Sequence, residues 1–240
     1  MIKIWRPCRR KDYLSMKVVG TILYGSNNYR LDTPESDRDY KIIVTPNFDE
    51  LYLKKDLNGA ALPFSYLDPE HYSYMDVRTF ANNLAKGNPN AIEMLFSTEI
   101  DDEFSDFRHL LEAWREPYFN GYVASQWHYF TEAVGGIMYN SFKRYGVTPK
   151  TASRVLYFYN LVNHIATHSF TINPDILRNE DVCERPRAIR FGLTSIWDNS
   201  ANEFMNIYHD MVDKIMVPDT LGFNSKVFII PTKEFVRRNM

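Results

Sequence analysis

The chain has 240 residues, enough for one large domain or two small ones with a substantial hydrophobic core. A hydrophobic content of 45%, with 16 Tyr and 16 Phe, excludes an intrinsically disordered chain. The formal net charge of -2 excludes a general attraction to nucleic acid, so such a contact would need a local basic cluster.

Cysteine usage and the length of apolar segments predict a protein of the cytoplasm. Cys8 and Cys183 are isolated and form neither a metal-ligand spacing nor a disulfide framework, which is typical of a reducing compartment. Residues 1–10 lack the apolar core of a signal peptide. Residues 152–170 are the longest apolar helical segment, but Arg154 and His164 interrupt it. We therefore expect a buried helix and no membrane contact.

Three strands are expected in the first half of the chain. Residues 17–24 and 39–44 are rich in β-branched side chains and are predicted as strands. Residues 71–75 alternate weakly between polar and apolar side chains and are predicted as a third strand. A Gly25-Ser26 pair follows the first strand, where we expect a short helix, and Pro34 marks a turn before the second strand.

Two short helices are predicted after the third strand. Asp76 suits the N-cap of a helix that runs to Ala85 and is closed by Gly87. An Asn-Pro-Asn sequence then starts a second helix over residues 91–96.

The acidic segment 99–106 is the expected domain boundary, because the pattern becomes helical beyond it. The predicted fold class is α+β, with a small mixed β-sheet domain over residues 1–105 and an all-helical domain over residues 106–240. Helices of the second domain are predicted over residues 107–114, 122–145, 149–170 and 201–216. The proline-containing segments 173–191 and 226–231 are predicted as a connecting loop and as a final strand or extended tail.

Residues 21–44 carry the most informative chemistry. Asp37 and Asp39 would share one face of a strand, where two carboxylates repel each other unless a cation lies between them. Oxygen ligands at this spacing suit Mg²⁺ or Mn²⁺, which also bind substrate phosphates. Gly25 lets the backbone approach a ligand, and Ser26 adds a hydroxyl and an N–H where a helix would begin.

A structural interpretation remains open for each motif taken alone. A Gly-Ser pair is a common turn, and an Asp-x-Asp sequence is a common surface pair. Here the two motifs occur in order, between apolar runs, and this combination favours a metal and phosphate site for phosphoryl or nucleotidyl transfer.

The order Gly25-Ser26, ten residues, Asp37-Arg38-Asp39 resembles the signature of the DNA polymerase beta nucleotidyltransferase superfamily. Within it, the chain is most similar to the predicted nucleotidyltransferases associated with RNA ligases in bacteria and phages. This closer resemblance is carried by Tyr29, Ser36, Arg78, Phe80, Gly87, Asn88, Pro89, Asn90 and Glu93, and by a helix start at Lys150. Arg30 stands where that branch has a second Gly.

The resemblance implies a nucleotidyltransferase domain, residues 1–105, and a helical substrate-side domain, residues 106–240. It implies transfer of a nucleoside monophosphate from an NTP such as ATP to an acceptor hydroxyl, with Mg²⁺ or Mn²⁺ and release of pyrophosphate. The acceptor would be an RNA or tRNA end, a protein or a small molecule. The implied metal ligands are Asp37 and Asp39, the nucleotide-binding residues Gly25, Ser26, Tyr29, Ser36 and Lys150, and the substrate-side residues Asn90, Glu93 and Arg154.

Lys150 and Arg154 lie one helical turn apart, so they would bind a triphosphate or the acceptor backbone, or form an ordinary solvated face. The superfamily also uses a third carboxylate on a further strand. The resemblance places it near residues 71–73, which are His, Tyr and Ser, so Glu70 and Asp76 are the nearby candidates. Glu70 is otherwise a loop acid and Asp76 an N-cap.

The uncertain third acid leaves a second function open. In that alternative the chain is a degenerate nucleotidyltransferase that binds nucleotide or RNA without catalysis. The sequence leaves the oligomeric state unspecified.

Overall fold

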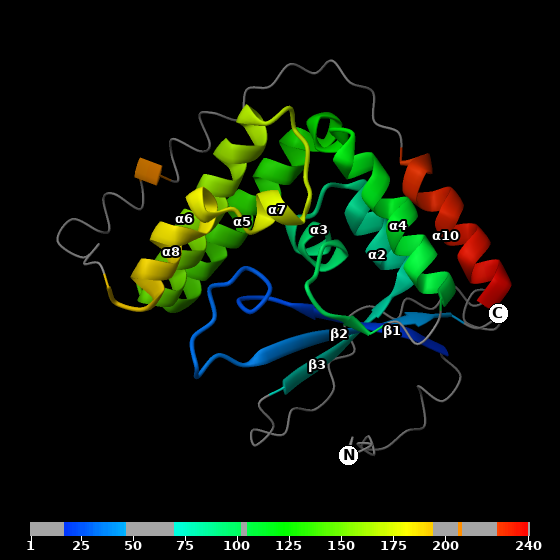
Figure 1. The fold of residues 1–240 in the computed structure, drawn as a ribbon, viewed down its shortest axis with the longest axis horizontal. Coiled ribbons are helices and arrows are strands. Elements are labelled where there is room, and N and C mark those ends of the chain that lie inside the picture. The colour runs from blue at the N-terminus through cyan, green and yellow to red at the C-terminus, as the bar shows by residue number, and fades with distance from the viewer. Residues whose placement is uncertain (1–16, 47–69, 102–104, 194–205, 208–224, 240) are drawn as a thin grey trace.

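In this computed structural model, a small β-sheet forms one layer and the helices cover one of its faces (Figure 1). The structure describes residues 17–46, 70–101, 105–193, 206–207 and 225–239. None of the helices in these ranges is long and apolar enough to cross a membrane. The mixed sheet and the predominance of helices agree with the predicted α+β class.

The sheet has four strands in the order β3-β2-β1-β4. They are β1 (Lys17–Tyr24), β2 (Arg38–Thr45), β3 (Glu70–Asp76) and β4 (Ile100–Asp101). β1 is antiparallel to β2 and β4, whereas β2 and β3 are parallel. The three predicted strands are confirmed, and the register places Tyr24 beside Asp39 at one end of the sheet.

The prediction of a short helix after the first strand is wrong. Residues 25–30 form consecutive turns, in which Gly25 O accepts the N–H of Asn28 at 2.9 Å and Ser26 O accepts the N–H of Leu31 at 3.0 Å. Gly25 and Arg30 have positive φ angles of 85° and 58°, which an α-helix does not contain. We refer to residues 25–36, which connect β1 to β2, as the turn segment.

The two short helices after β3 are confirmed, and their own side chains determine where they begin. α2 (Val77–Ala85) is capped by Asp76, whose carboxylate accepts the N–H of Arg78 at 2.7 Å. α3 (Pro89–Leu95) is capped by Asn88, with Pro89 in the first turn, where its missing N–H leaves no bond unmade.

The rest of the described chain is helical. Its elements are α4 (Ser105–Phe119), the 3₁₀ helix η1 (Tyr122–Gln126), α5 (Trp127–Tyr145), α6 (Pro149–Thr167), α7 (Pro174–Leu177), α8 (Glu180–Arg190) and α10 (Lys226–Asn239). The helices predicted over 107–114, 122–145 and 149–170 are confirmed with shifted ends. The helix predicted over 201–216 lies outside the described residues, except for the helical residues 206–207.

The predictions for segments 173–191 and 226–231 are wrong. The segment 173–191 forms α7 and α8, and the segment 226–231 is the first part of α10. Pro186 lies inside α8 and cannot donate a hydrogen bond to the carbonyl of Val182. The side chain of Asn160 on α6 donates to that carbonyl at 3.3 Å, so a contact from another helix compensates for the proline.

Buried side chains from both halves of the chain form one continuous hydrophobic cluster. It extends from Val19 on β1, through Phe107 and Trp114 on α4, to Phe228 on α10. Figure 1 shows α10 beside α4 and α2, and it packs against both. The C-terminal helix therefore completes the core over the first half of the chain.

Candidate functional site

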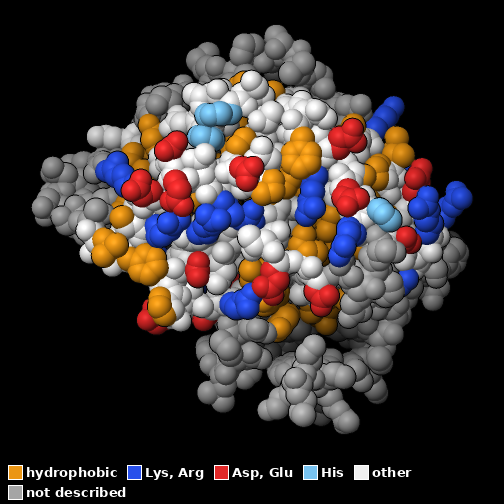
Figure 2. Space-filling view, in the orientation of Figure 1, with side chains coloured by type: hydrophobic (Ala, Val, Ile, Leu, Met, Phe, Trp, Pro, Cys, Tyr) orange, Lys and Arg blue, Asp and Glu red, His pale blue; other side chains and the backbone are white. Residues whose placement is uncertain are grey.

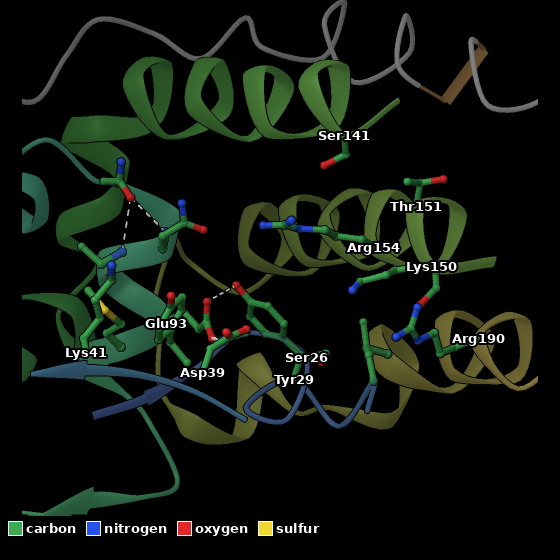
Figure 3. Close-up of a pocket in the computed structure, with 18 of the residues that line it drawn as sticks. Ser26, Tyr29, Asp39, Lys41, Glu93, Ser141, Lys150, Thr151, Arg154 and Arg190 are labelled. Carbon is green, nitrogen blue, oxygen red and sulfur yellow. Dashed lines mark hydrogen bonds between the residues drawn. The ribbon is translucent and has the colours of Figure 1, made fainter. Parts of the chain in front are cut away.

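A cavity of about 780 Å³ lies where the end of the sheet meets α3, α6 and α8 (Figure 3). This volume suits a small-molecule ligand. Of the predicted site residues, the cavity is lined by Gly25, Ser26, Tyr29, Asp39, Asn90, Glu93, Lys150 and Arg154. The fold therefore brings most of the predicted residues of both halves to one place.

The close approach of the turn segment to β2 explains the glycine at position 25. Gly25 has a φ of 85°, and a Cβ added to it would lie 3.2 Å from Oδ2 of Asp39. A side chain at this position would be strained and would crowd the carboxylate. Gly25 therefore allows Asp39 and Ser26 to line the same cavity.

The shared strand face expected for Asp37 and Asp39, if both lay on a strand, is not found. β2 begins at Arg38, so Asp37 precedes the strand; it is exposed and does not line the cavity. The side-chain amide of Asn27 donates to the backbone carbonyl of Asp37 at 2.7 Å and holds the chain there. Only Asp39 of this pair is part of the cavity wall.

Glu93 binds the turn segment rather than projecting freely into the cavity. Its side chain is 2% exposed, Oε1 accepts the N–H of Gly25 at 2.5 Å, and Oε2 accepts the hydroxyl of Tyr29. Asn28 Nδ2 donates to the carbonyl of Glu93 at 3.0 Å. Burial raises the pKa of Glu93 to about 7, although the hydrogen bonds from Tyr29, Gly25 and Asn28 lower it.

Tyr29 anchors the turn segment in the core. The centre of its ring lies 4.5 Å from that of the Tyr157 ring and 5.9 Å from that of the Phe158 ring, both on α6. Burial, and then the charge of Glu93, raises the pKa of the Tyr29 hydroxyl well above its usual value. Tyr29 lines the cavity, but its hydroxyl donates to Glu93, so its contribution is to hold the turns that carry Ser26.

Side chains of the helical half also bind the backbone of the turn segment. Arg178 donates to the carbonyls of Asn28 and Phe96, and Arg187 Nε donates to the carbonyl of Arg30 at 3.2 Å. Cys183 Sγ contacts the carbonyl of Tyr29 at 3.6 Å. Figure 2 shows basic side chains in a band across this face of the molecule, with acidic side chains on either side of it.

Cationic side chains from three elements line the cavity. Figure 3 shows Lys150 and Arg154 of α6 and Arg190 of α8 on one side of it, with Asp39 and Lys41 of β2 on the other. Arg190 Nη2 donates to Ser36 Oγ at 3.5 Å. Its Nε is buried and has no hydrogen-bond partner within the described part of the chain.

Lys41 lies two residues after Asp39 on the same side of β2, and both line the cavity. Its Nζ donates to Ser73 Oγ at 2.6 Å and lies 5.1 Å from the centre of the Tyr24 ring. Burial lowers the pKa of Lys41, and the charge of Asp39 opposes this change. Sequence reasoning missed Lys41 as a site residue, although strand alternation from Asp39 was a signal for it.

Asp76 lies away from the cavity. It is 0% exposed, caps α2, and its Oδ2 pairs with Arg78 Nη2 at 2.5 Å. It is opposite Val44, at the far end of the β2–β3 ladder from Asp39. The structural alternative for Asp76, an N-cap, is therefore the one that the fold supports.

The β3 register also separates Glu70 from Asp39. Glu70 is opposite Arg38, whereas His71 is opposite Asp39 and Ser73 is opposite Lys41. The β3 position paired with Asp39 is therefore a histidine and the one paired with Lys41 a serine, and neither is an acid. Across the described ranges, no three His, Cys, Asp or Glu side chains converge on one point.

Ser36 closes a turn rather than lining the cavity. Its hydroxyl accepts the N–H of Thr33 at 2.8 Å, and its own N–H donates to the carbonyl of Thr33 at 2.8 Å. Sequence reasoning missed the contributions of Arg190, Asn83 and Asn88 to the wall. No local pattern marks these three residues as neighbours of Asp39, because tertiary packing brings them there.

No protein-family model matches the sequence, and a search of curated proteins finds no similar one. The family resemblance therefore rests on the motif residues of the sequence alone.

Proposed function

We propose that the protein is a metal-dependent nucleotidyltransferase that moves a nucleoside monophosphate from an NTP to an acceptor hydroxyl and releases pyrophosphate. The observation that carries the proposal is the cavity in which Asp39 and Ser26 face the cations Lys150, Arg154 and Arg190. A polyphosphate matches this arrangement because its anionic oxygens need cations along their length. The buried, unpartnered Nε of Arg190 is one donor that such a ligand would satisfy.

The donor set fits a hard divalent cation. Mg²⁺ is typically held by one or two carboxylates and completes its coordination with water and substrate phosphate oxygens. Asp39 in the cavity wall would supply the carboxylate, and water and phosphate oxygens would complete the coordination. When bound, Mg²⁺ or Mn²⁺ supplies charge neutralisation at the reacting phosphate.

The protein's own residues orient the substrate. Lys150, Arg154 and Arg190 bind the phosphates that leave as pyrophosphate, and Ser26 is placed to bind a phosphate oxygen. The acceptor hydroxyl attacks the α-phosphorus, and the bond between this phosphorus and the oxygen that bridges it to the β-phosphorus breaks. Pyrophosphate leaves with that oxygen, and the hydroxyl proton passes to water. Positioning and charge stabilisation supply most of the catalysis in such reactions.

Binding without catalysis is the second candidate. The observation that favours it is the β3 register, which places His71 beside Asp39 and Ser73 beside Lys41. Ser73 accepts a hydrogen bond from Lys41 and is not an acid. In this candidate the same cavity binds an NTP, and no pyrophosphate is released.

Calorimetry and a transfer assay test both candidates. The purified protein is titrated with each NTP in the presence of Mg²⁺, and labelled NMP incorporation is followed over RNA ends, tRNA, proteins and small hydroxyl compounds. Asp39→Asn should lower transfer at least about a hundredfold, as expected when a group that stabilises transition-state charge is removed. Asp175→Asn, at an exposed aspartate outside the cavity, should leave transfer unchanged.

The outcomes separate the candidates. NTP binding together with pyrophosphate release supports the enzyme. NTP binding without release over the whole acceptor panel supports the binding protein. If the wild-type protein binds no NTP in the presence of Mg²⁺, both are wrong.

A further inference from the structure

The cavity continues past Asp39 into a corner with a different chemistry. Its wall there is formed by Asn83 of α2, Asn88 and Asn90 at the start of α3, and the thioethers of Met75 and Met94. In Figure 3 α3, drawn in teal, lies on the opposite side of Asp39 from α6 and α8. The cations of α6 and α8 and this amide corner are therefore at different ends of one cavity.

The amide of Asn88 is fixed in one orientation. Its Oδ1 accepts the N–H of Asn90 at 3.0 Å and that of Ala91 at 3.2 Å, which caps α3. The carbonyl end of the side chain is therefore occupied, and Nδ2 remains as a hydrogen-bond donor in the cavity wall. A ligand in this corner must present an acceptor to Asn88.

The other two amides are available for a ligand. Within the described part of the chain, the side chains of Asn83 and Asn90 make no hydrogen bond, although both line the cavity. Each offers a donor and an acceptor side by side. This pairing matches the edge of a nucleobase, which asparagine recognises with two parallel hydrogen bonds.

The remaining wall suits a flat ring. Met75 and Met94 are soft, polarisable side chains that adapt to aromatic faces. The sheet contributes one cation to the cavity wall, Lys41, whose Nζ donates to Ser73, whereas α6 and α8 contribute three at the other end. The cations of α6 and α8 therefore match the triphosphate of a nucleotide, and the amide corner matches its other end. The α-phosphate would then lie near Asp39.

We infer that the corner of Asn83, Asn88 and Asn90 is the nucleobase subsite of the NTP. The inference rests on the proposed function, because it assigns the opposite end of the cavity to the triphosphate. It makes these amides the residues that determine which base is preferred.

The test compares an NTP with inorganic tripolyphosphate, which has the same phosphates and no nucleoside. Both are titrated calorimetrically with Mg²⁺, using ATP, GTP, CTP and UTP for the base preference. The wild-type protein should bind at least one NTP more tightly than tripolyphosphate. Asn83→Ala and Asn90→Ala should each lower the affinity for that NTP roughly tenfold and leave the affinity for tripolyphosphate unchanged. A tenfold loss is the effect of removing about one well-placed hydrogen bond.

Three further variants keep the result interpretable. Asn88→Ser retains an oxygen that can cap α3 and removes the Nδ2 donor without adding charge, so it should weaken NTP binding alone without loss of folding. Asn82→Ala, at the exposed neighbour of Asn83, should change neither ligand. Lys150→Met should weaken both ligands, because it acts on the phosphates.

The inference is overturned if the asparagine variants leave NTP binding unchanged or weaken both ligands equally. It is also overturned if they raise only the KM for the acceptor, which would assign the corner to the acceptor instead. A wild-type protein that binds neither ligand contradicts the proposed function as well. Binding of tripolyphosphate and NTP with equal affinity contradicts the base subsite alone.

Discussion

Glu93 offers the most direct test of how the turn segment is held. The perturbation is Glu93→Gln, which keeps the size of the side chain. Its Oε1 can still accept the N–H of Gly25, and its amide nitrogen can donate to the oxygen of Tyr29. The variant therefore resembles the protonated form of Glu93 at every pH.

The sign of the effect follows from the raised pKa of Glu93. Burial moves this pKa from 4.5 to about 7, so between these values the folded protein holds a proton that the unfolded chain has released. Wild-type stability therefore falls as pH rises from about 4.5 to about 7, and the loss is complete above that window. At 1.36 kcal/mol per pKa unit, the loss is about 3 kcal/mol.

The variant lacks this loss, so its stability relative to the wild type should rise by about 3 kcal/mol across the same window. The assay is urea unfolding at pH 4.5, 5, 6, 7 and 8 without added metal, followed by the fluorescence of the buried Trp114 and Trp127. Comparing the two proteins at each pH cancels the titration of the other groups.

A difference between the two proteins that stays constant with pH would refute the reasoning, and so would one that changes in the opposite direction. Tyr29→Phe gives an independent check. Its hydroxyl donates to Glu93 and lowers the pKa of that carboxyl in the folded protein, so removing it should extend the window to higher pH and leave its lower end unchanged.

Two further substitutions test the geometry of the cavity and of the sheet. Gly25→Ala should cost about 1–2 kcal/mol through its positive φ and also weaken Mg²⁺-NTP binding, because its Cβ would crowd Asp39. Gly146→Ala, whose φ is 65° and whose Cβ would meet no atom within 4 Å, should show the stability loss alone; equal effects on binding would exclude crowding. Asp76→Ala should cost about 2–4 kcal/mol by removing the α2 cap and the partner of Arg78, with NTP binding intact in urea-free buffer. A folded Asp76→Ala protein that no longer binds NTP would place this acid in the site after all.

The elements that could be predicted from the sequence are those whose ends are determined locally. Asp76 and Asn88 each accept backbone N–H groups two or three residues ahead, so the residue type alone predicts the helix start. α8 has the same kind of cap, because the side chain of Asn179 accepts the N–H of Asp181 at 2.8 Å, but its proline favoured a loop prediction. Its internal Pro186 is tolerated because Asn160, on another helix, bonds the carbonyl that the proline leaves unpaired.

The same distinction applies to the site. Gly25 and Asp39 belong to two short motifs whose order and spacing are readable, and they do meet. Asp37 is two residues from Asp39, but it lies before β2, as it lay before the strand predicted over residues 39–44, so the spacing alone could not establish a shared face. Arg190 reaches the cavity only through the packing of α8 against α6.

The attachment of the turn segment has a consequence for how a ligand would enter the cavity. Glu93 of α3 holds these turns from one side and Arg178 and Arg187 hold them from the other, over a core that is continuous between the halves. A hinge needs a few residues that absorb a large backbone rotation with few contacts across them. The contacts here oppose such a rotation, so we expect no opening and closing of two lobes. Ligand exchange would instead depend on rearrangement of side chains at the mouth, and release of product would not wait for a slow domain movement.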